Sequence, residues 1–181
     1  MSTSRDEVTV TLAYGGAIHA TLPAAALGPA VTPEHLGEPI ALGREITWAL
    51  NDSEHAVHPH DPRQNGVHGT VRFDELGDAE NEVYQRNVAV FADGEVDRSP
   101  CGSGTCARLA VLADDGRLSA GSVVRHESII GSTFTGTVLD RVHVAGRPAV
   151  VPRVTGMAHR TGDQVCSIDP HDPLVPGSVL R

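Results

Sequence analysis

Aromatic side chains make up only 3% of this 181-residue sequence, and basic residues are also few. A hydrophobic core must therefore be built from Val, Leu, Ile and Ala, which suits β-strands and a helix of small residues. The 14 basic residues are outnumbered by 23 acidic ones. Because phosphate binding needs clustered Lys and Arg, no nucleic-acid partner is expected. No run of about 18 apolar residues occurs, so we expect no membrane-spanning helix and no membrane partner.

Cysteine is scarce as well, and three cysteines at uneven spacing do not make a disulfide framework. Residues 1–7 are polar and lack the apolar stretch of a secretory signal. These features favour a reduced, cytoplasmic setting. The length suffices for a single globular domain with a sizeable core.

The most informative stretch is a polar, glycine-rich turn over residues 97–104 that runs into an apolar segment over 105–113. Proline and small residues let this backbone turn sharply and approach a ligand. The segment that follows is predicted to be a buried helix, whose first N–H groups lack intrahelical partners and attract a carboxylate. Cys101 stands at this helix start, where the same field favours thiolate over thiol. The stretch indicates a thiol acid/base beside a carboxylate cradle.

Period-two alternation predicts short strands elsewhere, so one buried helix among many strands indicates an α+β fold with a sheet curled around a helix. A further helix is expected from about Thr32, interrupted near Pro39. Residues 74–82 are expected to form an acidic solvent loop. The predicted strands are 8–12, 17–22, 69–73, 83–84 with 87–91, 123–126, 128–130, 133–138, 142–145, 149–154 and 164–168.

Three histidines, His55, His58 and His60, lie among aspartates in a polar segment. This spacing would also fit metal ligands, but we interpret the segment as a connecting loop and predict no metal site. Cys106 is expected to be a core residue of the helix, and Cys166 to pack in a terminal strand.

Residues 97–105 read DRSPCGSGT, which resembles the second catalytic motif of the proline racemase family. This family comprises proline racemases, hydroxyproline epimerases and related dehydratases. The resemblance covers nearly the whole chain in order, although family members are nearly twice as long and their front half is absent here. The other matching segments are 14–16, 86–88, 126–136, 156–159 and 169–173.

The resemblance implies a diaminopimelate-epimerase-like lobe, in which a curled, barrel-like sheet surrounds a central buried helix. Residues 1–50 would be remnant strands and the crossover segment of the missing front lobe. Residues 51–160 would form the catalytic lobe that carries the motif. Residues 161–181 would be a C-terminal strand that returns towards the front lobe.

The resemblance also implies a site for a small cyclic imino acid, proline or hydroxyproline. Asp97 would contact the ring nitrogen of the substrate, since a carboxylate suits a secondary ammonium. The backbone N–H groups of Gly102 and Ser103 would hold the substrate carboxylate. Two further residues would lie near the substrate, Phe91 and His68.

In this family two cysteines flank the substrate's α-carbon, and neither a cofactor nor a metal takes part. One thiolate removes the α-proton while the opposite thiol delivers a proton to the other face. Cys101 would be one of the two thiols. The other belongs to a front-half motif of the type Met-Cys-Gly-His, which this sequence lacks.

Three hypotheses follow from this difference. The chain would be a racemase or epimerase that is a fragment or one half of a split protein, a trans-3-hydroxyproline dehydratase, or a non-catalytic remnant or binding module. A twofold homodimer would bring two Cys101 residues together and restore a two-thiol site by symmetry.

Overall fold

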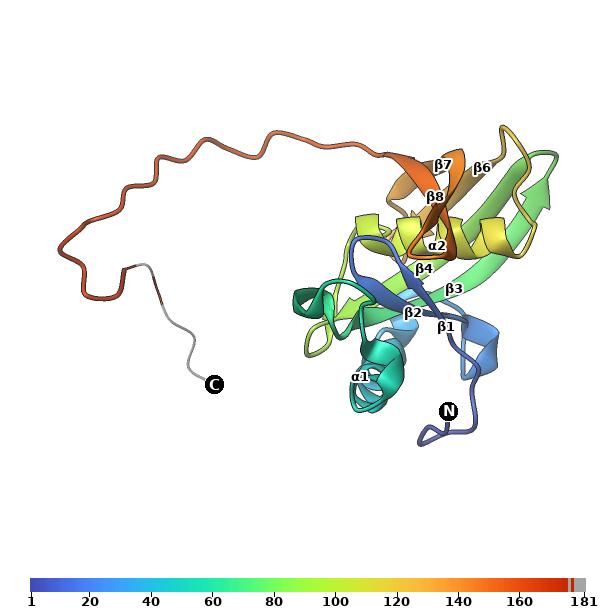
Figure 1. Cartoon of the computed structure of the whole chain (residues 1–181), viewed down its shortest axis with the longest axis horizontal. Coiled ribbons are helices and arrows are strands. Elements are labelled where there is room, and N and C mark those ends of the chain that lie inside the picture. The colour runs from blue at the N-terminus through green and yellow to red at the C-terminus, as the bar shows by residue number, and fades with distance from the viewer. Residues whose placement is uncertain (176, 178–181) are drawn as a thin grey trace.

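The computed structural model describes residues 1–175 and Gly177. Within them an eight-stranded sheet has the order β1-β2-β3-β4-β6-β7-β8, with β5 paired to β4 (Figure 1). No helix in this part of the chain is both long enough and apolar enough to cross a bilayer. The elements are β1 (Thr11–Tyr14), β2 (Ile18–Pro23), α1 (Gly37–Asn51), β3 (Val67–Ala79), β4 (Glu82–Phe91), β5 (Glu95–Val96), α2 (Gly102–Asp114), β6 (Val123–Ser128), β7 (Thr133–Val144) and β8 (Arg147–Thr155).

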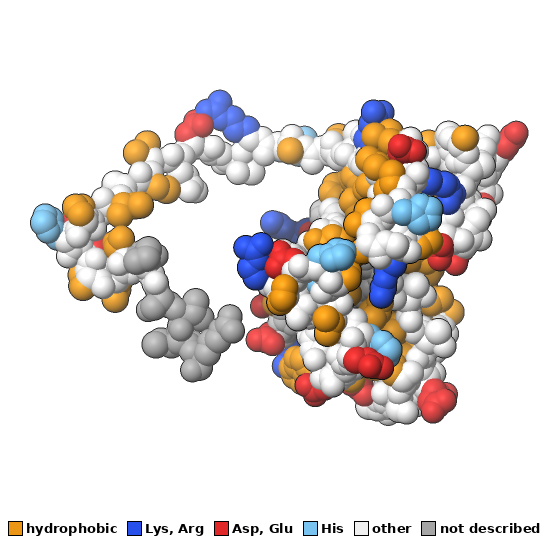
Figure 2. Space-filling view, in the orientation of Figure 1, with side chains coloured by type: hydrophobic (Ala, Val, Ile, Leu, Met, Phe, Trp, Pro, Cys, Tyr) orange, Lys and Arg blue, Asp and Glu red, His pale blue; other side chains and the backbone are white. Residues whose placement is uncertain are grey.

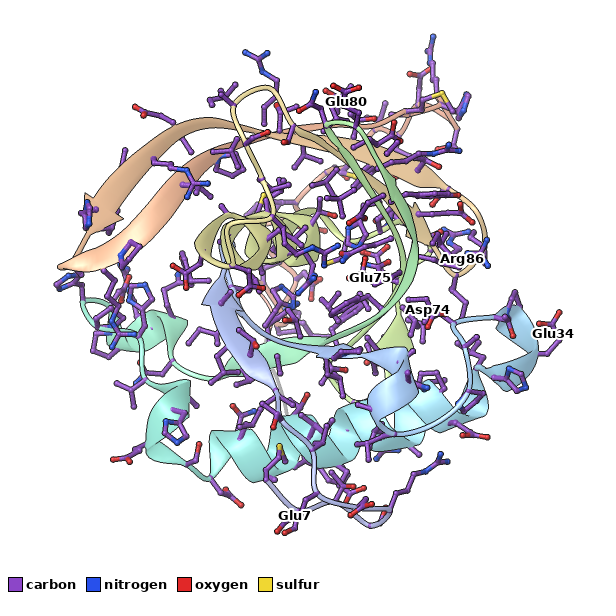
Figure 3. The ribbon with its side chains drawn as sticks, turned by 90° about the vertical axis from the view of Figure 1, so that its right-hand side faces the viewer. Glu7, Glu34, Asp74, Glu75, Glu80 and Arg86 are labelled. Carbon is purple, nitrogen blue, oxygen red and sulfur yellow. The ribbon has the colours of Figure 1, made fainter. Side chains whose placement is uncertain are left out.

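Two crossovers place the helices on opposite faces of the sheet. The strands β2 and β3 are parallel and joined through α1, and β4 and β6 are parallel and joined through α2. Both steps run in the same direction across the sheet, but β3 and β4 are antiparallel, so β4 points opposite to β2. Because such connections are right-handed, reversing the strand direction moves the helix to the other face. Figure 3 shows α1 beneath the sheet and α2 inside its curve.

The sheet curls around α2, which confirms the expected α+β fold with a curled sheet and a buried helix. The helix contacts β1 and β2 at one end of the sheet and β7 and β8 at the other (Figure 3). Leu109 and Leu112 on α2 have no exposed surface and pack against Val83 and Val124 of the sheet. Full burial of such a side chain contributes about 1.5–3 kcal/mol, so this packing holds α2 in the curve.

The two faces of β2 differ in polarity. Alternate residues of β2, Ile18, Ala20 and Leu22, belong to the apolar core that contains α1. The residues between them, His19 and Thr21, are equally buried but turn towards α2. Successive side chains of a strand point to opposite faces. The inner face of the curl is therefore partly polar, and its polar groups need partners on α2.

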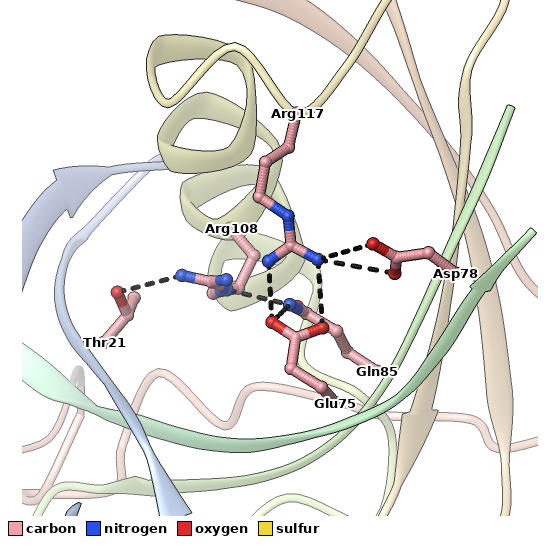
Figure 4. Close-up of polar contacts among 6 residues, drawn as sticks. All are labelled: Thr21, Glu75, Asp78, Gln85, Arg108 and Arg117. Carbon is pink, nitrogen blue, oxygen red and sulfur yellow. Dashed lines mark hydrogen bonds and ion pairs between the residues drawn. The ribbon is translucent and has the colours of Figure 1, made fainter.

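Arg108 supplies one of these partnerships near the middle of α2 (Figure 4). Its side chain is 3% exposed and lies with its guanidinium carbon 3.7 Å from the centre of the Phe73 ring. Its Nε donates to Gln85 Oε1 at 3.3 Å, and Nη1 donates to Thr21 Oγ1 at 3.3 Å. Burial lowers the pKa of Arg108 to about 10, so it stays charged at neutral pH.

Glu75 links this buried arginine to the surface. Gln85 Nε2 donates to Glu75 Oε1 at 2.7 Å, and Arg117 Nη1 donates to the same oxygen at 2.7 Å. Burial raises the pKa of Glu75, but the hydrogen bonds from Arg117 and Gln85 together outweigh it and lower the pKa. Arg117 also pairs with Asp78, and both side chains are partly exposed, so this outer pair contributes little to stability (Figure 4).

The expected interruption of the first helix is wrong. α1 begins at Gly37 and continues through Pro39 to Asn51. Pro39 lies in the first turn, where a backbone N–H has no intrahelical acceptor, so the missing donor does not break the helix.

The expected acidic loop over residues 74–82 is also wrong. β3 continues to Ala79, turns at Asn81 with a φ of 62°, and pairs antiparallel with β4. Glu75 lies opposite Gln85, and Asp78 lies opposite Val83. The charged side chains lie on an exposed hairpin, and such a hairpin has the polar composition of a loop.

Residues 156–169 form neither helix nor strand, so the strand expected over 164–168 is not present. This segment runs away from the sheet (Figure 1), and without a neighbouring strand its backbone has no ladder partner. Its apolar side chains, such as Met157, Val165 and Ile168, are 79% exposed or more, and Figure 2 shows them spread along the extended chain.

We predict that Gly15→Ala destabilises the protein by about 1–3 kcal/mol, because overpacking has this cost. A Cβ at Gly15 would overlap the Ser103 carbonyl oxygen and lie 2.7 Å from the Ala107 nitrogen, so the turn after β1 would be forced off α2. Gly37→Ala is the matched control, since a Cβ there meets nothing within 4 Å. Urea denaturation of both variants measures the difference, and equal midpoints would contradict the close approach.

Candidate active site at the start of α2

Cys101 is the N-cap residue of α2 and has a φ of 66°, which L-residues rarely adopt. The chain reaches it from β4 through the short strand β5, which folds back onto β4. The Asp97 N–H then donates to the Ala89 carbonyl at 3.1 Å, which keeps the turn against the sheet. The Cys101 side chain is 9% exposed and packs against Val71 and Ala89.

Asp97 and Ser99 order the outer part of this turn. Asp97 Oδ1 accepts a hydrogen bond from the Ser99 N–H at 2.8 Å. The Ser99 hydroxyl oxygen in turn accepts from the Cys101 N–H at 3.1 Å. The Asp97 carboxylate therefore fixes the turn, and its second oxygen is available for a further partner.

The inner part of the turn is held at the Pro100 carbonyl. Asn87 Nδ2 donates to this oxygen at 2.8 Å, and Thr105 Oγ1 donates to it at 3.3 Å. His126 Nδ1 lies 2.8 Å from Thr105 Oγ1. Because Nε2 of His126 is buried without a partner among the described residues, the ring proton is assigned to Nδ1, which donates to Thr105 while the threonine hydroxyl donates to Pro100.

His126 is wholly buried, and burial followed by the charge of Arg108 lowers its pKa to about 3. Its Nε2 has no hydrogen-bond partner in the described part of the chain. In a buried site, a neutral imidazole with an unpaired acceptor nitrogen costs less free energy than a charged ring or an unpaired N–H. His126 is therefore a neutral support behind the turn.

The Cys101 sulfur lies in the first turn of α2. The Gly104 N–H donates to Sγ at 3.4 Å, and Ser103 Oγ lies 3.6 Å from it. A Cβ at Gly104 would lie 2.9 Å from Val71 Cγ2 and 3.2 Å from the sulfur. Only glycine at this position leaves room for both the thiol and the close packing of the helix on the sheet.

Gly102 and Ser103 are the first two residues of α2 and directly follow Cys101. The first intrahelical bond runs from the Thr105 N–H to the Cys101 carbonyl at 2.8 Å, so the three preceding N–H groups have no backbone acceptor within the helix. The Gly104 N–H donates to the sulfur instead, which leaves those of Gly102 and Ser103 for a ligand. Gly102 is exposed and Ser103 half-buried. The positive end of the helix dipole adds to these donors, which suits a carboxylate.

A line of rings runs beside this turn. His68 stacks on Phe91 at 5.8 Å between centroids with an interplanar angle of 9°. His19 meets His68 edge to face at 5.6 Å, and His19 Nε2 lies 2.8 Å from Ser103 Oγ. Ring contacts therefore connect Phe91 and His68 to His19, and a hydrogen bond connects His19 to Ser103.

Sequence reasoning missed His19, which is 1% exposed on the α2 side of β2. Burial, and then the neighbouring His68, lower its pKa to about 4, so it is neutral near neutral pH. The only signal in the sequence was the period-two pattern of β2, which puts a polar residue between Ile18 and Ala20. Asn87, Thr105 and His126 were also missed as supports of the turn.

The remaining candidates lie apart or are poorly placed for chemistry. The histidine-rich loop forms no group of three His, Cys, Asp or Glu that could hold a metal within the described residues. Cys106 is half-buried on α2, and burial followed by Cys101 raises the pKa of its thiol. Cys166 is exposed in the extended segment, so the expectation that it packs in a strand is wrong.

The sequence model of the proline racemase family matches residues 3–179. A 3-hydroxyproline 2-epimerase of Burkholderia multivorans is 40% identical over 174 residues, 96% of this chain and 51% of that protein. A trans-3-hydroxy-L-proline dehydratase of Burkholderia cenocepacia is 40% identical over 176 residues, with the same two coverages. The crystal structure of a hydroxyproline epimerase from Agrobacterium vitis with bound trans-4-OH-L-proline has a TM-score of 0.86 at 35% identity, and covers 99% of this chain and 51% of that chain. The chain thus spans about half the length of the curated relatives it matches.

We predict that stability falls with pH below neutrality because His19 and His126 are buried in neutral form. Their pKa values are lowered from 6.5 to about 4 and about 3, so unfolding takes up a proton at each below pH 6.5. Each lowers the free energy of unfolding by up to about 1.4 kcal/mol per pH unit as pH falls through this range. His126→Asn keeps a polar atom near the Nδ1 position and removes the titration. Urea denaturation from about pH 6 to about pH 5 should show a shallower slope in this variant.

The exposed His159 supplies the control for this experiment, as His159→Asn. This variant should keep the slope of the unchanged protein. Identical slopes for all three proteins would contradict a neutral, buried His126.

Proposed function

This chain belongs to the proline racemase family, and from that premise we propose that Cys101 is one of two thiols that move a proton at the α-carbon of a cyclic imino acid. The observation that carries the proposal is the position of Cys101 at the N-cap of α2, where its sulfur accepts from the Gly104 N–H and the N–H groups of Gly102 and Ser103 have no intrahelical acceptor. A carboxylate bound to these donors brings the atom next to it, the α-carbon, towards the sulfur. No cofactor is required for this step.

The chemistry needed at such a site is the removal of a weakly acidic hydrogen. The Cys101 thiolate takes the α-proton and becomes a thiol, and the electron pair of the C–H bond is delocalised into the carboxylate. Donors already pointed at that carboxylate stabilise the developing charge without rearrangement. A second thiol then gives a proton to the opposite face of the carbon, which inverts it.

Asp97 supports the assignment of the substrate class. One of its oxygens accepts from Ser99, which leaves the other free to accept from a secondary ammonium. The ring pair formed by His68 and Phe91 offers a flat surface for a small ring. Proline and hydroxyproline have both features, a carboxylate and a secondary ammonium on a five-membered ring.

The second thiol has no candidate within the described part of this chain. Cys106 lies on α2 itself, five residues after Cys101, and Cys166 lies in the extended segment. We propose that the thiol comes from the portion of its relatives' length that this chain does not span. A second copy of the chain is the alternative source, and it would present another Cys101.

Dehydration is the second candidate function, since one relative at 40% identity is named a trans-3-hydroxy-L-proline dehydratase. It shares the first step, loss of the α-proton to a thiolate. The two reactions diverge when the carbanion expels the 3-hydroxyl as water or accepts a proton. The group that decides between them faces Cys101 across the substrate.

Ligand protection tests the substrate site directly. Pyrrole-2-carboxylate, a planar mimic of the deprotonated substrate, should protect Cys101 from iodoacetamide, because a transition-state mimic binds more tightly than substrate. Asp97→Asn keeps the acceptor for the Ser99 N–H but removes the charge, and we expect about tenfold weaker protection, in line with the loss of one charge-assisted hydrogen bond. Peptide mass spectrometry measures the labelled fraction at each cysteine.

Asp93→Asn serves as the control because Asp93 is an exposed aspartate in the neighbouring turn between β4 and β5. It should leave protection unchanged. Equal protection in the Asp97 and Asp93 variants would remove the role given to Asp97, and absence of protection in the unchanged protein would overturn the substrate site.

Exchange of the α-hydrogen tests the proton transfer. In deuterated water, we expect this chain to exchange the α-hydrogen of L-proline or trans-4-hydroxy-L-proline only when a polypeptide with the other half of a full-length relative is added. Cys101→Ala should abolish the exchange, since the proton acceptor is gone. Exchange by the chain alone would instead support a site made by two copies, which light scattering would show as a dimer.

A further inference from the structure

We propose that His19 is a positioning residue that holds Cys101 as a thiolate, by donating a hydrogen bond to Ser103 which in turn donates to the Cys101 sulfur. This inference rests on the proposed role of Cys101 in proton transfer and specifies the direction in which that transfer begins. Cys101 is then the proton acceptor of the resting site, and the opposite thiol is the donor.

The three side chains form a continuous line from the sheet to the sulfur. His19 Nε2 lies 2.8 Å from Ser103 Oγ, and Ser103 Oγ lies 3.6 Å from Cys101 Sγ. The latter distance suits a hydrogen bond to the larger sulfur atom. The sulfur also accepts from the Gly104 N–H at 3.4 Å, so donors reach it from the helix as well.

The direction of the hydrogen bonds follows from burial. His19 is 1% exposed, and its Nδ1 is buried without a hydrogen-bond partner. If Nδ1 carried the ring proton, a buried N–H would be left without an acceptor, which is rarer in proteins than a bare acceptor. The proton therefore belongs on Nε2, which makes His19 a donor to Ser103. The single hydroxyl proton of Ser103 is then free to point at the sulfur.

The surroundings of His19 keep it in this neutral form. The titratable groups that face it are His68 on β3 and, across Ser103, Cys101 at the start of α2, with Cys106 one turn further along the helix. Burial and the proximity of His68 both disfavour a positive charge on His19 and lower its pKa to about 4. His19 is therefore a poor proton acceptor at neutral pH, which excludes it as the base that deprotonates Cys101.

The hydrogen bonds from His19 to Ser103 and from Ser103 to the Cys101 sulfur affect the thiolate and the neutral thiol differently. A hydrogen bond to a charged acceptor is worth more than one to a neutral acceptor, so the line stabilises the thiolate more than the thiol. During the reaction the α-proton moves to Sγ, and His19 and Ser103 keep their own protons. The substrate enantiomer that presents its α-hydrogen to Cys101 is then the one that reacts with the resting site.

The alkylation rate of Cys101 reports the thiolate directly and needs neither substrate nor a second chain. We expect His19→Phe to lower the iodoacetamide rate constant of Cys101 about tenfold near pH 7, because the thiolate is the form that reacts and it loses a supporting donor. The rate should approach that of the unchanged protein at alkaline pH, where every thiol is ionised. His19→Gln can still aim an amide N–H at Ser103 and should restore most of the rate.

Ser103→Ala removes the middle of the line and should lower the rate to the same extent. The double variant of His19→Phe and Ser103→Ala should show no further loss, because both changes break one line. If His19→Phe does not fold, the pH dependence of Cys101 alkylation in Ser103→Ala, compared with the unchanged protein, tests the proposal.

Two results would overturn the proposal. An unchanged pH profile in Ser103→Ala would show that the sulfur receives no support from the hydroxyl. A fall by one constant factor at every pH in His19→Phe would show a steric role only. Failure of the proposed function appears elsewhere, as an absence of protection by pyrrole-2-carboxylate in the unchanged protein, so the two conclusions stand or fall separately.

Discussion

The hydrogen bonds to the Pro100 carbonyl are the interaction on which the site depends. They hold the turn where Cys101 has a φ of 66°, a conformation that costs on the order of 1–3 kcal/mol for an L-residue. Asn87 and Thr105 donate to that one oxygen, and His126 orients Thr105. If this peptide rotated, the sulfur would leave the side of the helix where the free N–H groups point. The strain is thus maintained by the inner face of the sheet, and it gives the thiol its position.

The polarity of that inner face has a topological origin. The two crossovers put α1 and α2 on opposite faces of the sheet, so each strand between them serves two cores. On β2 the residues that face α1 are apolar, whereas His19 on β2 and Asn87 on β4 face α2 and hydrogen-bond to its first residues or to the turn before it. One sheet thereby combines packing on one side with support for a reactive turn on the other. Arg108, deeper along α2, shows the same use of polar contacts in the curl.

The sequence predicted the features of this protein that are set by neighbouring residues. Proline, glycine and an apolar run are enough to predict a turn that leads into a buried helix with Cys101 near its start, although α2 begins at Gly102 and not at Thr105. The hairpin over residues 74–82 was missed because its acidic side chains match loop composition, while its strands are specified by pairing with β4. His19 was missed for a related reason. It contacts Ser103, which is 84 positions further along the chain, and no local pattern encodes that contact.

The exposure of the thiol site bears on the proposed need for the rest of the relatives' length. Gly102 is exposed and Ser103 only half-buried, so water reaches the donors beside Cys101. Water weakens hydrogen bonds to a developing charge, and proton abstraction from carbon needs these bonds at full strength. In the proposed reaction, a carboxylate at the N-cap would therefore need a cover that excludes water before proton transfer could be fast. The same cover would have to bring a proton donor to the opposite face of the carbon, so one partner surface would satisfy both requirements of the proposal.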